Sequence, residues 1–240
     1  MLFRSSPLKA VPALEQAAQA LARGDTLEHS IAATGYRATR SSYLSMSGDG
    51  VATNAAQLIV ERADCKAIMD PAFTDVGVYL DARELRMVAA APFAPSVQMT
   101  QNDAGRRVLD LVNRARSQAR TCGSKSFGAA KPVRWNDKLA AAGRAHADDM
   151  ARKNYFSHDG RDGSTPAQRV TRAGYRYRTT GENIAAGQMD PEGAVAGWIK
   201  SPPHCANLMN GAFTEMGVGF AVNDKSEMGV YWAQEFGTPR

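Results

Sequence analysis

Two histidines and one glutamate stand in contexts that could bring them into a shared site. His158 lies in a loop of Gly, Asp and Ser residues, SHDGRDGS, from which a side chain can project into a cleft. Glu182 interrupts the small, apolar stretch GENIAAG, and His204 follows two prolines at an expected helix start. Two imidazoles and a carboxylate form the ligand set of an open zinc site. We therefore take these three residues as candidate ligands of zinc or another divalent cation.

The spacing of these residues does not by itself identify a metal site. Intervals of 24 and 22 residues separate them in sequence order, unlike the short H-E-x-x-H pattern of zinc proteases. A further histidine, His146, lies on the apolar face of an expected helix. At such a position a buried packing histidine is more common than a metal ligand. The residues alone leave both interpretations of the group open.

Hydrophobic periodicity predicts the elements that position these side chains. Apolar residues at helical spacing indicate helices over residues 102–120 and from about 136 to 153. Capping residues followed by proline mark two more helix starts, at Pro166 and Pro191. The segment 216–236 has two alternating strands around a polar turn. Helices followed by a terminal hairpin predict an α+β domain with an antiparallel sheet.

The chain contains a match to itself. Residues 65–78 align with residues 205–218, and seven of the fourteen pairs are identical: Cys, Met, Ala, Phe, Thr, Gly and Val. A second match, in the same order and at nearly the same offset, aligns residues 31–37 with 170–176. We interpret the pattern as an ancestral duplication. It predicts a degenerate partial copy with its linker over residues 1–96 and a complete domain over residues 97–240.

The two copies differ in their polar residues. The loop 156–164 has no counterpart in the first copy. The alignment pairs His146 with Leu21, Glu182 with Ser42 or Tyr43, and His204 with Asp64. The first copy thus retains packing residues and lacks the candidate site. The proline-containing segment 91–98 is the expected linker.

Composition excludes several classes of protein. Of the 240 residues, 44% are hydrophobic and 22% charged, which is typical of a folded chain rather than a disordered one. No apolar run approaches the roughly 20 residues of a membrane-spanning helix, so we do not expect an integral membrane protein. The net charge of +5 is dispersed along helical stretches without an RNA-binding or zinc-finger pattern. We expect no specific recognition of nucleic acid.

The three cysteines and the N-terminal residues are the evidence in the sequence about the cellular compartment of the protein. Cys65, Cys122 and Cys205 allow one disulfide and contain no C-x-x-C pair. The first residues lack the apolar core of a signal peptide, so the chain is either intracellular or written here without an export signal. A truncated or misassigned start would account for the missing signal, the partial first copy and an unpaired Cys65.

Four segments together resemble the CAP superfamily, which groups cysteine-rich secretory proteins, antigen 5 and pathogenesis-related proteins. They are AHADDMARKNYFSHDG, GENIAAG, SPPHCANLMNGAFTEMGVGF and YWAQEFG. The resemblance covers residues 100–240 and is closest to the bacterial secreted branch. It implies an α-β-α sandwich with a central antiparallel sheet and a large open cleft.

The resemblance also implies a site and a disulfide. The cleft histidines of the family correspond to His158 and His204, and the first acid to Glu182. The second acid falls on Ser201, so the usual set of four is reduced; Glu215 is a nearby candidate, although an acid at a strand start more often lies on the surface. Cysteines in the segments RTCG and HCAN commonly occur together in the bacterial branch, which implies a Cys122–Cys205 disulfide closing about 80 residues.

Three functions follow as hypotheses. The first is an exported bacterial protein whose cleft binds a divalent metal and a lipid, sterol or other envelope-derived ligand, without classical catalysis. The second is a metal-dependent hydrolase of peptidase, esterase or nuclease type, in which Glu182 acts as base for a metal-bound water. The third is a structural module in which the degenerate copy caps the complete one. No G-x-S-x-G pattern supports a serine hydrolase, and the ligand and oligomeric state stay open.

Overall fold

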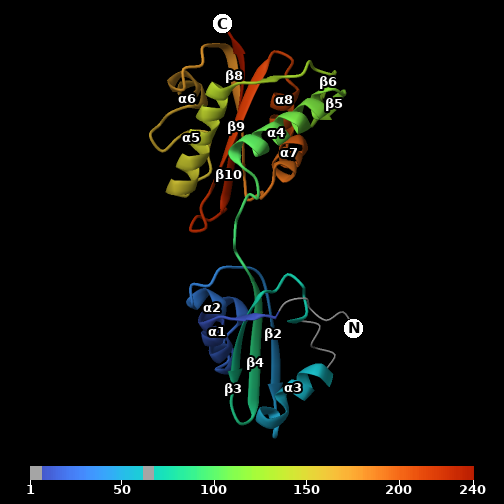
Figure 1. Ribbon diagram of the computed structural model, residues 1–240, viewed down its shortest axis with the longest axis vertical. Coiled ribbons are helices and arrows are strands. Elements are labelled where there is room, and N and C mark those ends of the chain that lie inside the picture. The colour runs from blue at the N-terminus through green and yellow to red at the C-terminus, as the bar shows by residue number, and fades with distance from the viewer. Residues whose placement is uncertain (1–6, 62–67) are drawn as a thin grey trace. The chain divides into compact units, whose positions relative to one another are not determined.

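The computed structural model describes residues 7–61 and 68–240 and divides the chain into two compact units (Figure 1). Unit 1 covers residues 1–93 and unit 2 covers residues 94–240, so the division falls inside the proline-containing segment expected to be a linker. Within the described residues, no helix combines the length and apolarity needed to cross a membrane. The match that involves Cys65 lies partly outside the described residues.

Unit 2 is an α-β-α sandwich. Its sheet has the order β7-β9-β10-β8, in which β7 runs parallel to β9 and the other neighbours are antiparallel. Helices α5 and α6 cover one face, and α4, α7 and α8 cover the other (Figure 1). The elements are α4 (Gln101–Arg116), β5 (Arg120–Cys122), β6 (Lys125–Phe127), β7 (Arg134–Trp135), α5 (Asp137–Lys153), α6 (Pro166–Arg172), β8 (Tyr177–Ala186), α7 (Pro191–Lys200), α8 (Pro202–Met209), β9 (Glu215–Val222) and β10 (Val230–Pro239). The expected fold class is confirmed.

The helix starts lie where the sequence predicts them. Thr165 forms a capping box with Gln168 before α6, and the Asp190 side chain accepts the Gly193 N–H at the start of α7. The first expected helix, over residues 102–120, is shorter in the structure, where α4 ends at Arg116. The residues after it turn into the short hairpin β5–β6, which the buried Cys122–Cys205 disulfide ties to α8. The expected disulfide is confirmed.

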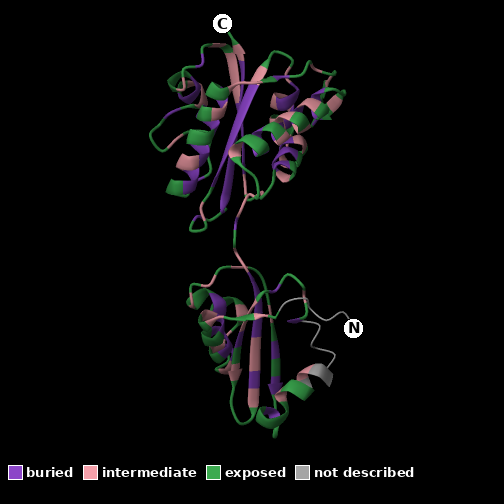
Figure 2. Ribbon diagram, in the orientation of Figure 1, coloured by how far each residue is buried: buried purple, intermediate pink, exposed green. Residues whose placement is uncertain are grey.

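Unit 2 has its largest apolar cluster between the sheet and α4, α7 and α8. Trp198, Trp232 and Phe236 are buried there, and Figure 2 shows the buried centre of the sheet. On the opposite face α5 lies so close to β9 that two strand positions must be glycine. A Cβ at Gly217 would lie 2.0 Å from the Ala140 backbone nitrogen. This close approach fixes the distance between α5 and the site residues on the sheet.

Unit 1 has a sheet of the order β1-β3-β4-β2, again with one parallel pair at the β1 edge. Helices α1 and α2 lie on one face and α3 on the other (Figure 1). The elements are β1 (Lys9–Ala10), α1 (Pro12–Ala22), α2 (Leu27–Ala33), β2 (Ala38–Ser47), α3 (Val51–Glu61), β3 (Asp75–Leu80) and β4 (Glu84–Pro92). Strands β1, β2, β3 and β4 correspond to β7, β8, β9 and β10 of unit 2. With these counterparts the two sheets have the same strand order.

The match extends to individual contacts. The Tyr36 hydroxyl donates to Asp75 at 2.9 Å in unit 1, and the Tyr175 hydroxyl donates to Glu215 at 2.8 Å in unit 2. A Cβ at Gly77 would meet the backbone of α1 as one at Gly217 would meet α5. The duplication itself is an evolutionary interpretation, to which we return below.

The substitution Gly217→Ala should destabilise the protein by about 1–3 kcal/mol, because the added methyl group overlaps the backbone of α5 and forces the helix away from the sheet. Urea denaturation of the full chain measures the change. Gly128→Ala is the control, since no atom lies within 4 Å of a Cβ built there. Equal stability of the two variants would contradict the close approach.

Candidate functional site

The three candidate residues line one cleft in unit 2. The cleft has a volume of about 590 Å³, and its lining includes His158, Glu182, His204, Phe127, Asn207 and Asn210. His158 comes from the loop after α5, Glu182 from β8, and His204 from the first turn of α8. Residues separated by 46 positions in the chain therefore meet where the loop and α8 flank the middle of β8.

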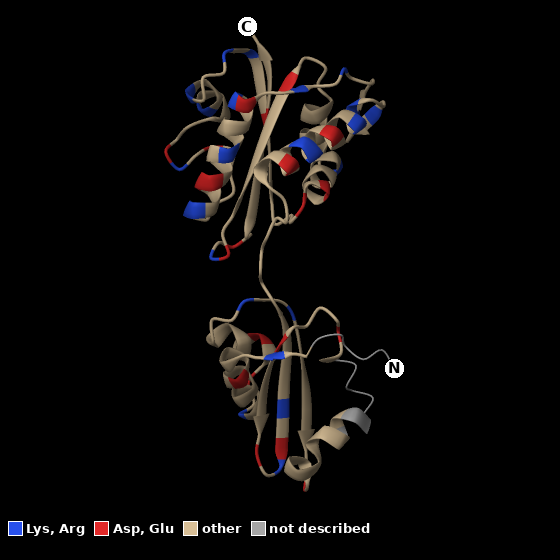
Figure 3. Cartoon of the chain, in the orientation of Figure 1, with Lys and Arg blue, Asp and Glu red and all other residues tan. Residues whose placement is uncertain are grey.

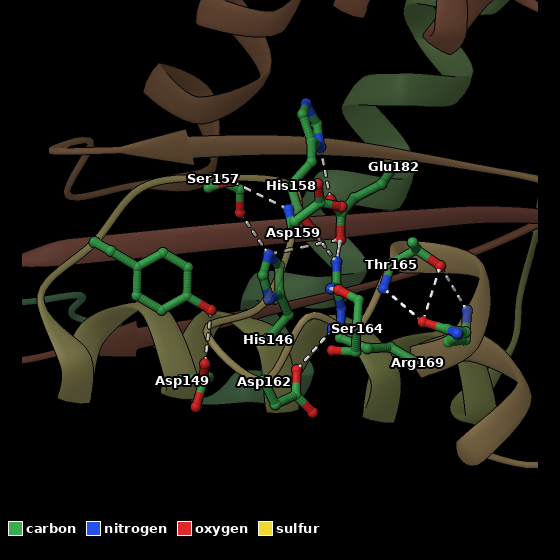
Figure 4. A network of polar contacts seen from close by, with 12 residues as sticks. His146, Asp149, Ser157, His158, Asp159, Asp162, Ser164, Thr165, Arg169 and Glu182 are labelled. Carbon is green, nitrogen blue, oxygen red and sulfur yellow. Dashed lines mark hydrogen bonds and ion pairs between the residues drawn. The ribbon is translucent and has the colours of Figure 1, made fainter.

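His158 is held by Glu182. Its Nδ1 lies 2.7 Å from Glu182 Oε1, while its side chain is half exposed (Figure 4). The hydrogen bond to Glu182 is the main reason that the pKa of His158 is raised, against a smaller effect of burial. Because a carboxylate only accepts, Nδ1 carries the proton. In the neutral ring, the lone pair is then on Nε2, and no hydrogen bond to that atom is found among the described residues.

Glu182 is a buried charge with a partner on each oxygen. Its side chain is 1% exposed, and Arg169 Nη2 donates to Oε2 at 2.7 Å. Burial opposes ionisation, but the hydrogen bond from His158 and the charge of Arg169 outweigh it and hold the pKa of Glu182 below its ordinary value. Glu182 is therefore a carboxylate that is fully engaged within the protein.

Arg169 ties this carboxylate to the loop that carries His158. Its guanidinium also donates to the carbonyl oxygens of His158 and Ser164, each at 2.7 Å (Figure 4). The side chain is 9% exposed, and α6 positions it because the capping box fixes the start of that short helix. Sequence analysis missed Arg169, since its position in a short basic helix gives no sign that it points inward.

A second acid, Glu235, lies beside Glu182 on the neighbouring strand. The two residues are directly paired in the β8–β10 register, and Glu235 is 0% exposed. Burial and the neighbouring negative charge raise the pKa of Glu235 well above its ordinary value. Two adjacent buried carboxyl groups resist ionising together, and the cation and the imidazole that would balance a charge both contact Glu182. Sequence analysis also missed this residue; its sign was an acid at an inward position of the apolar segment YWAQEF.

His146 is buried on α5, as its apolar face predicted. It is 1% exposed, and its Nε2 lies 2.9 Å from the Ser157 carbonyl oxygen and 3.9 Å from Glu182 Oε2. Burial is the largest effect on its pKa and lowers it. Because a carbonyl oxygen only accepts, Nε2–H is the donor to Ser157. His146 thus supports the loop after α5 through the Ser157 carbonyl and is not among the residues that line the cleft.

His204 completes the polar wall of the cleft. Its ring centroid lies 6.3 Å from that of His158. Burial, and after it the charge of His158, lowers the pKa of His204. The next residue, Cys205, is disulfide-bonded to Cys122, which fixes the first turn of α8 against the β5–β6 hairpin.

The donor atoms fit a divalent metal in part. His158 Nε2 and the His204 ring are imidazole donors, and a carboxylate hydrogen-bonded to the far nitrogen is the usual outer partner of a zinc-bound histidine. The contact between Glu182 Oε1 and His158 Nδ1 has this form, and Arg169 binds the other oxygen of Glu182. Over residues 7–61 and 68–240, no three His, Cys, Asp or Glu residues are arranged as a metal site. Metal binding stays a prediction, with two imidazoles as its donors.

Glu215, the candidate fourth ligand, lies elsewhere. Its Oε2 accepts hydrogen bonds from Tyr175 at 2.8 Å and Asn136 at 3.2 Å, at the β7–β9 edge of the sheet. The structure does not bring it to the two histidines. The Ser201 position, where the resemblance places the second acid, is the residue between α7 and α8.

Replacing the carboxylate should change the titration of His158. In Glu182→Gln the hydrogen bond to a negative charge is lost, so the pKa of His158 should fall. Because the folded-state pKa of His158 is raised in the wild type, the pair stabilises the fold below the unfolded pKa of about 6.5 and loses that contribution as pH rises through the folded value.

NMR titration of the histidine ring protons measures this shift. Asp25→Asn is the control, since it removes the carboxylate bonded to the exposed His29 in unit 1 and should leave His158 unchanged. An unchanged His158 pKa in Glu182→Gln would show that the carboxylate does not control this imidazole.

Known proteins match parts of this chain. The family model "Cysteine-rich secretory protein family" (CAP) matches residues 109–236. The protein YkwD of Bacillus subtilis is 34% identical over 131 residues, which cover 55% of this chain and 46% of YkwD. The membrane protein YlbC of the same organism is 32% identical over 119 residues, 50% of this chain and 32% of YlbC. The chain thus spans less than half the length of either relative.

Two solved structures are also similar. An extracellular SCP-domain protein of Bacillus anthracis shares 27% identity with a TM-score of 0.47, covering 68% of this chain and 56% of its own. A cysteine-rich secretory protein of Staphylococcus aureus shares 16% identity with a TM-score of 0.44, covering 67% and 54%. The family model covers more than half of the residues. The chain belongs to the CAP family, the cysteine-rich secretory proteins.

Proposed function

We propose that this protein is an exported, non-catalytic CAP-domain protein whose cleft binds a divalent metal ion through His158 and His204, together with a small ligand. The observation that supports it most is the 2.7 Å bond from His158 Nδ1 to the buried Glu182. This bond orients the ring and leaves Nε2 as its donor atom. Fixed imidazoles at a cleft surface are suited to metal binding.

A bound zinc ion would supply a Lewis acid that holds an oxygen or nitrogen of a ligand. His158 and His204 would hold the ion, while Glu182 and Arg169 keep His158 in place without touching it. With two protein donors, the other coordination positions of the ion are left to water or ligand. We therefore expect the protein to bind the ion more weakly than a three-ligand site does. Phe127, Asn207 and Asn210 line the same cleft. This mixed lining suits a small lipid, sterol or envelope-derived molecule.

Catalysis by Glu182 is less well supported. A general base needs a free oxygen within reach of the proton that it removes. Both Glu182 oxygens are engaged, and its side chain is 1% exposed. We therefore propose a binding protein rather than the metal-dependent hydrolase considered from sequence.

We also propose that residues 1–96 descend from the same domain as residues 97–240 and have lost the site. The shared strand order and the register of the two sheets support this relationship. Tyr43 pairs with Val88 in unit 1 at the position where Glu182 pairs with Glu235 in unit 2. An exposed Tyr and an apolar Val thus stand where unit 2 has its two acids.

Zinc titration of the metal-stripped full chain tests the metal site. Calorimetry should show saturable binding in the wild type and none in the double variant His158→Ala/His204→Ala, because the two donor nitrogens are removed. His29→Ala is the matched control and should bind as the wild type does, since His29 is an exposed histidine of unit 1. Equal zinc affinity in all three proteins, or no binding to the wild type, would contradict the proposal.

The disulfide supports an oxidising compartment outside the cytoplasm, where such bonds persist. In protein isolated from cells under acid quench, thiol alkylation followed by mass spectrometry should find Cys122 and Cys205 blocked. After reduction, both should become alkylated. Two free thiols in the quenched native protein would contradict export.

A further inference from the structure

Unit 2 has a second cavity, between α5, α6 and the loop that joins them. Its volume is about 410 Å³, which is within the range of small-molecule binding sites. None of the residues that line it belongs to the lining of the cleft with His158 and His204. The second cavity is therefore a place for a ligand apart from the proposed metal site.

Much of the wall of this cavity is small and apolar. Ala141, Ala142 and Ala145 of α5 line it, as does Ala173 at the end of α6. An alanine side chain ends at Cβ, so the space between the two helices stays open at these positions. The four methyl groups offer an apolar surface to the body of a ligand.

The charged residues at the rim of the cavity are paired with one another. Lys153 Nζ lies 2.8 Å from Asp149 Oδ1, and Arg172 Nη1 lies 2.9 Å from Asp162 Oδ2. Basic and acidic residues occur together on α5 and in the loop after it (Figure 3). These two pairs give the rim no net charge, which favours a neutral ligand over an ion.

The buried part of the lining contains two polar atoms without a partner. His146 and Arg169 both line the cavity and are more than nine-tenths buried. Their other nitrogens are engaged, His146 Nε2 with Ser157 and the two Nη atoms of Arg169 with Ser164, His158 and Glu182 (Figure 4). Within the described residues, His146 Nδ1 and Arg169 Nε have no hydrogen-bond partner. Buried polar atoms are nearly always hydrogen-bonded, so this pair indicates a ligand.

The two atoms need a group that both donates and accepts. Arg169 Nε–H is a donor. Burial lowers the pKa of His146 and so favours the uncharged ring, in which Nε2–H bonds to Ser157 and Nδ1 is an acceptor. A carboxylate could satisfy only Arg169, and an ammonium group only His146. A hydroxyl satisfies both, because its oxygen accepts one hydrogen bond while its proton is donated in another.

Unit 1 keeps the same fold without these two groups. The alignment pairs His146 with Leu21, and the match of residues 31–37 with 170–176, extended by one residue, pairs Arg169 with Ser30. Leu21 packs in the apolar cluster of α1. Packing of the helices on the sheet therefore does not require the polar pair, which supports a binding role for it.

We propose that the second cavity of unit 2 binds a small neutral alcohol, whose hydroxyl donates to His146 Nδ1 and accepts from Arg169 Nε–H. The apolar body of the alcohol packs on the four alanines. The site does not depend on metal binding in the cleft, so either proposal can fail while the other holds.

Phenol is the probe, because its hydroxyl both donates and accepts. NMR of the full chain, labelled with ¹³C at the alanine methyl groups, follows the titration. The methyl resonances of Ala142 and Ala145 should shift in a saturable manner that fits one site. Anisole, in which a methyl group caps the oxygen, should bind at least tenfold more weakly, since it cannot donate to Nδ1.

A second NMR measurement reports the hydroxyl contact directly. The ¹⁵N resonance of a bare imidazole nitrogen moves when that nitrogen accepts a hydrogen bond. The signal of His146 Nδ1 should therefore shift with saturating phenol and stay in place with anisole.

The variant Ala145→Leu tests where the probe binds. Ala145 is exposed on α5 and lines the cavity, so the longer side chain should fill the space and weaken phenol binding at least tenfold. Ala32→Leu is the matched control, since it adds the same groups at an exposed position of α2 in unit 1 and should leave binding unchanged.

The variant His146→Leu tests the polar contact by placing there the residue that unit 1 has. Phenol should then lose its advantage over anisole. Thermal melting checks that each variant is folded. Ala145→Leu leaves the polar network intact, so it still tests the site if His146→Leu does not fold.

Four results would overturn the proposal. The first is no saturable shift of the alanine methyl resonances by phenol, and the second is unchanged phenol affinity in folded Ala145→Leu. The third is equal affinity for phenol and anisole, which would leave the polar pair to ordered water. The fourth is tighter binding of benzoate than of phenol, which would assign the cavity to an anion.

Discussion

The buried charge of Glu182 is the constraint on which the site depends. A carboxylate that is 1% exposed is tolerated only with compensating partners. Arg169 supplies the opposite charge and His158 a second hydrogen bond, while burial and the charge of Glu182 raise the pKa of Glu235 beside it. Each partner comes from a different element. The contacts that neutralise the Glu182 carboxylate therefore join α6, the loop after α5 and the centre of the sheet.

That arrangement separates the roles of the three histidines in unit 2. His146 is buried, which lowers its pKa, and it supports the loop through the Ser157 carbonyl. His158 is fixed through Nδ1 and half exposed, and His204 is held on a helix whose next residue is disulfide-bonded. Only the last two line the cleft. A histidine in this domain therefore serves packing or binding, depending on how far its side chain is buried and on which ring nitrogen forms a hydrogen bond.

Unit 1 shows what the fold requires when no charge is buried at this place. Val88 is fully buried at the position of Glu235, and Leu21 packs in the α1 core where His146 would lie. The sheet order and the glycine contact between β3 and α1 are retained without the polar network. The network is thus a feature of the site and not a condition for the sandwich, whose cohesion comes from helix packing on the sheet.

The sequence by itself determined the α+β class, the helix starts, the terminal hairpin and the resemblance that paired Cys122 with Cys205, because periodicity, caps and motifs are local signals. It also selected His158, Glu182 and His204. Only the tertiary structure decided their roles: strand register placed Glu235 beside Glu182, and helix packing brought Arg169 to both. It also placed Glu215 at another edge with Tyr175. Register and the direction of a side chain across a buried interface are non-local, so no run of neighbouring residues specifies them.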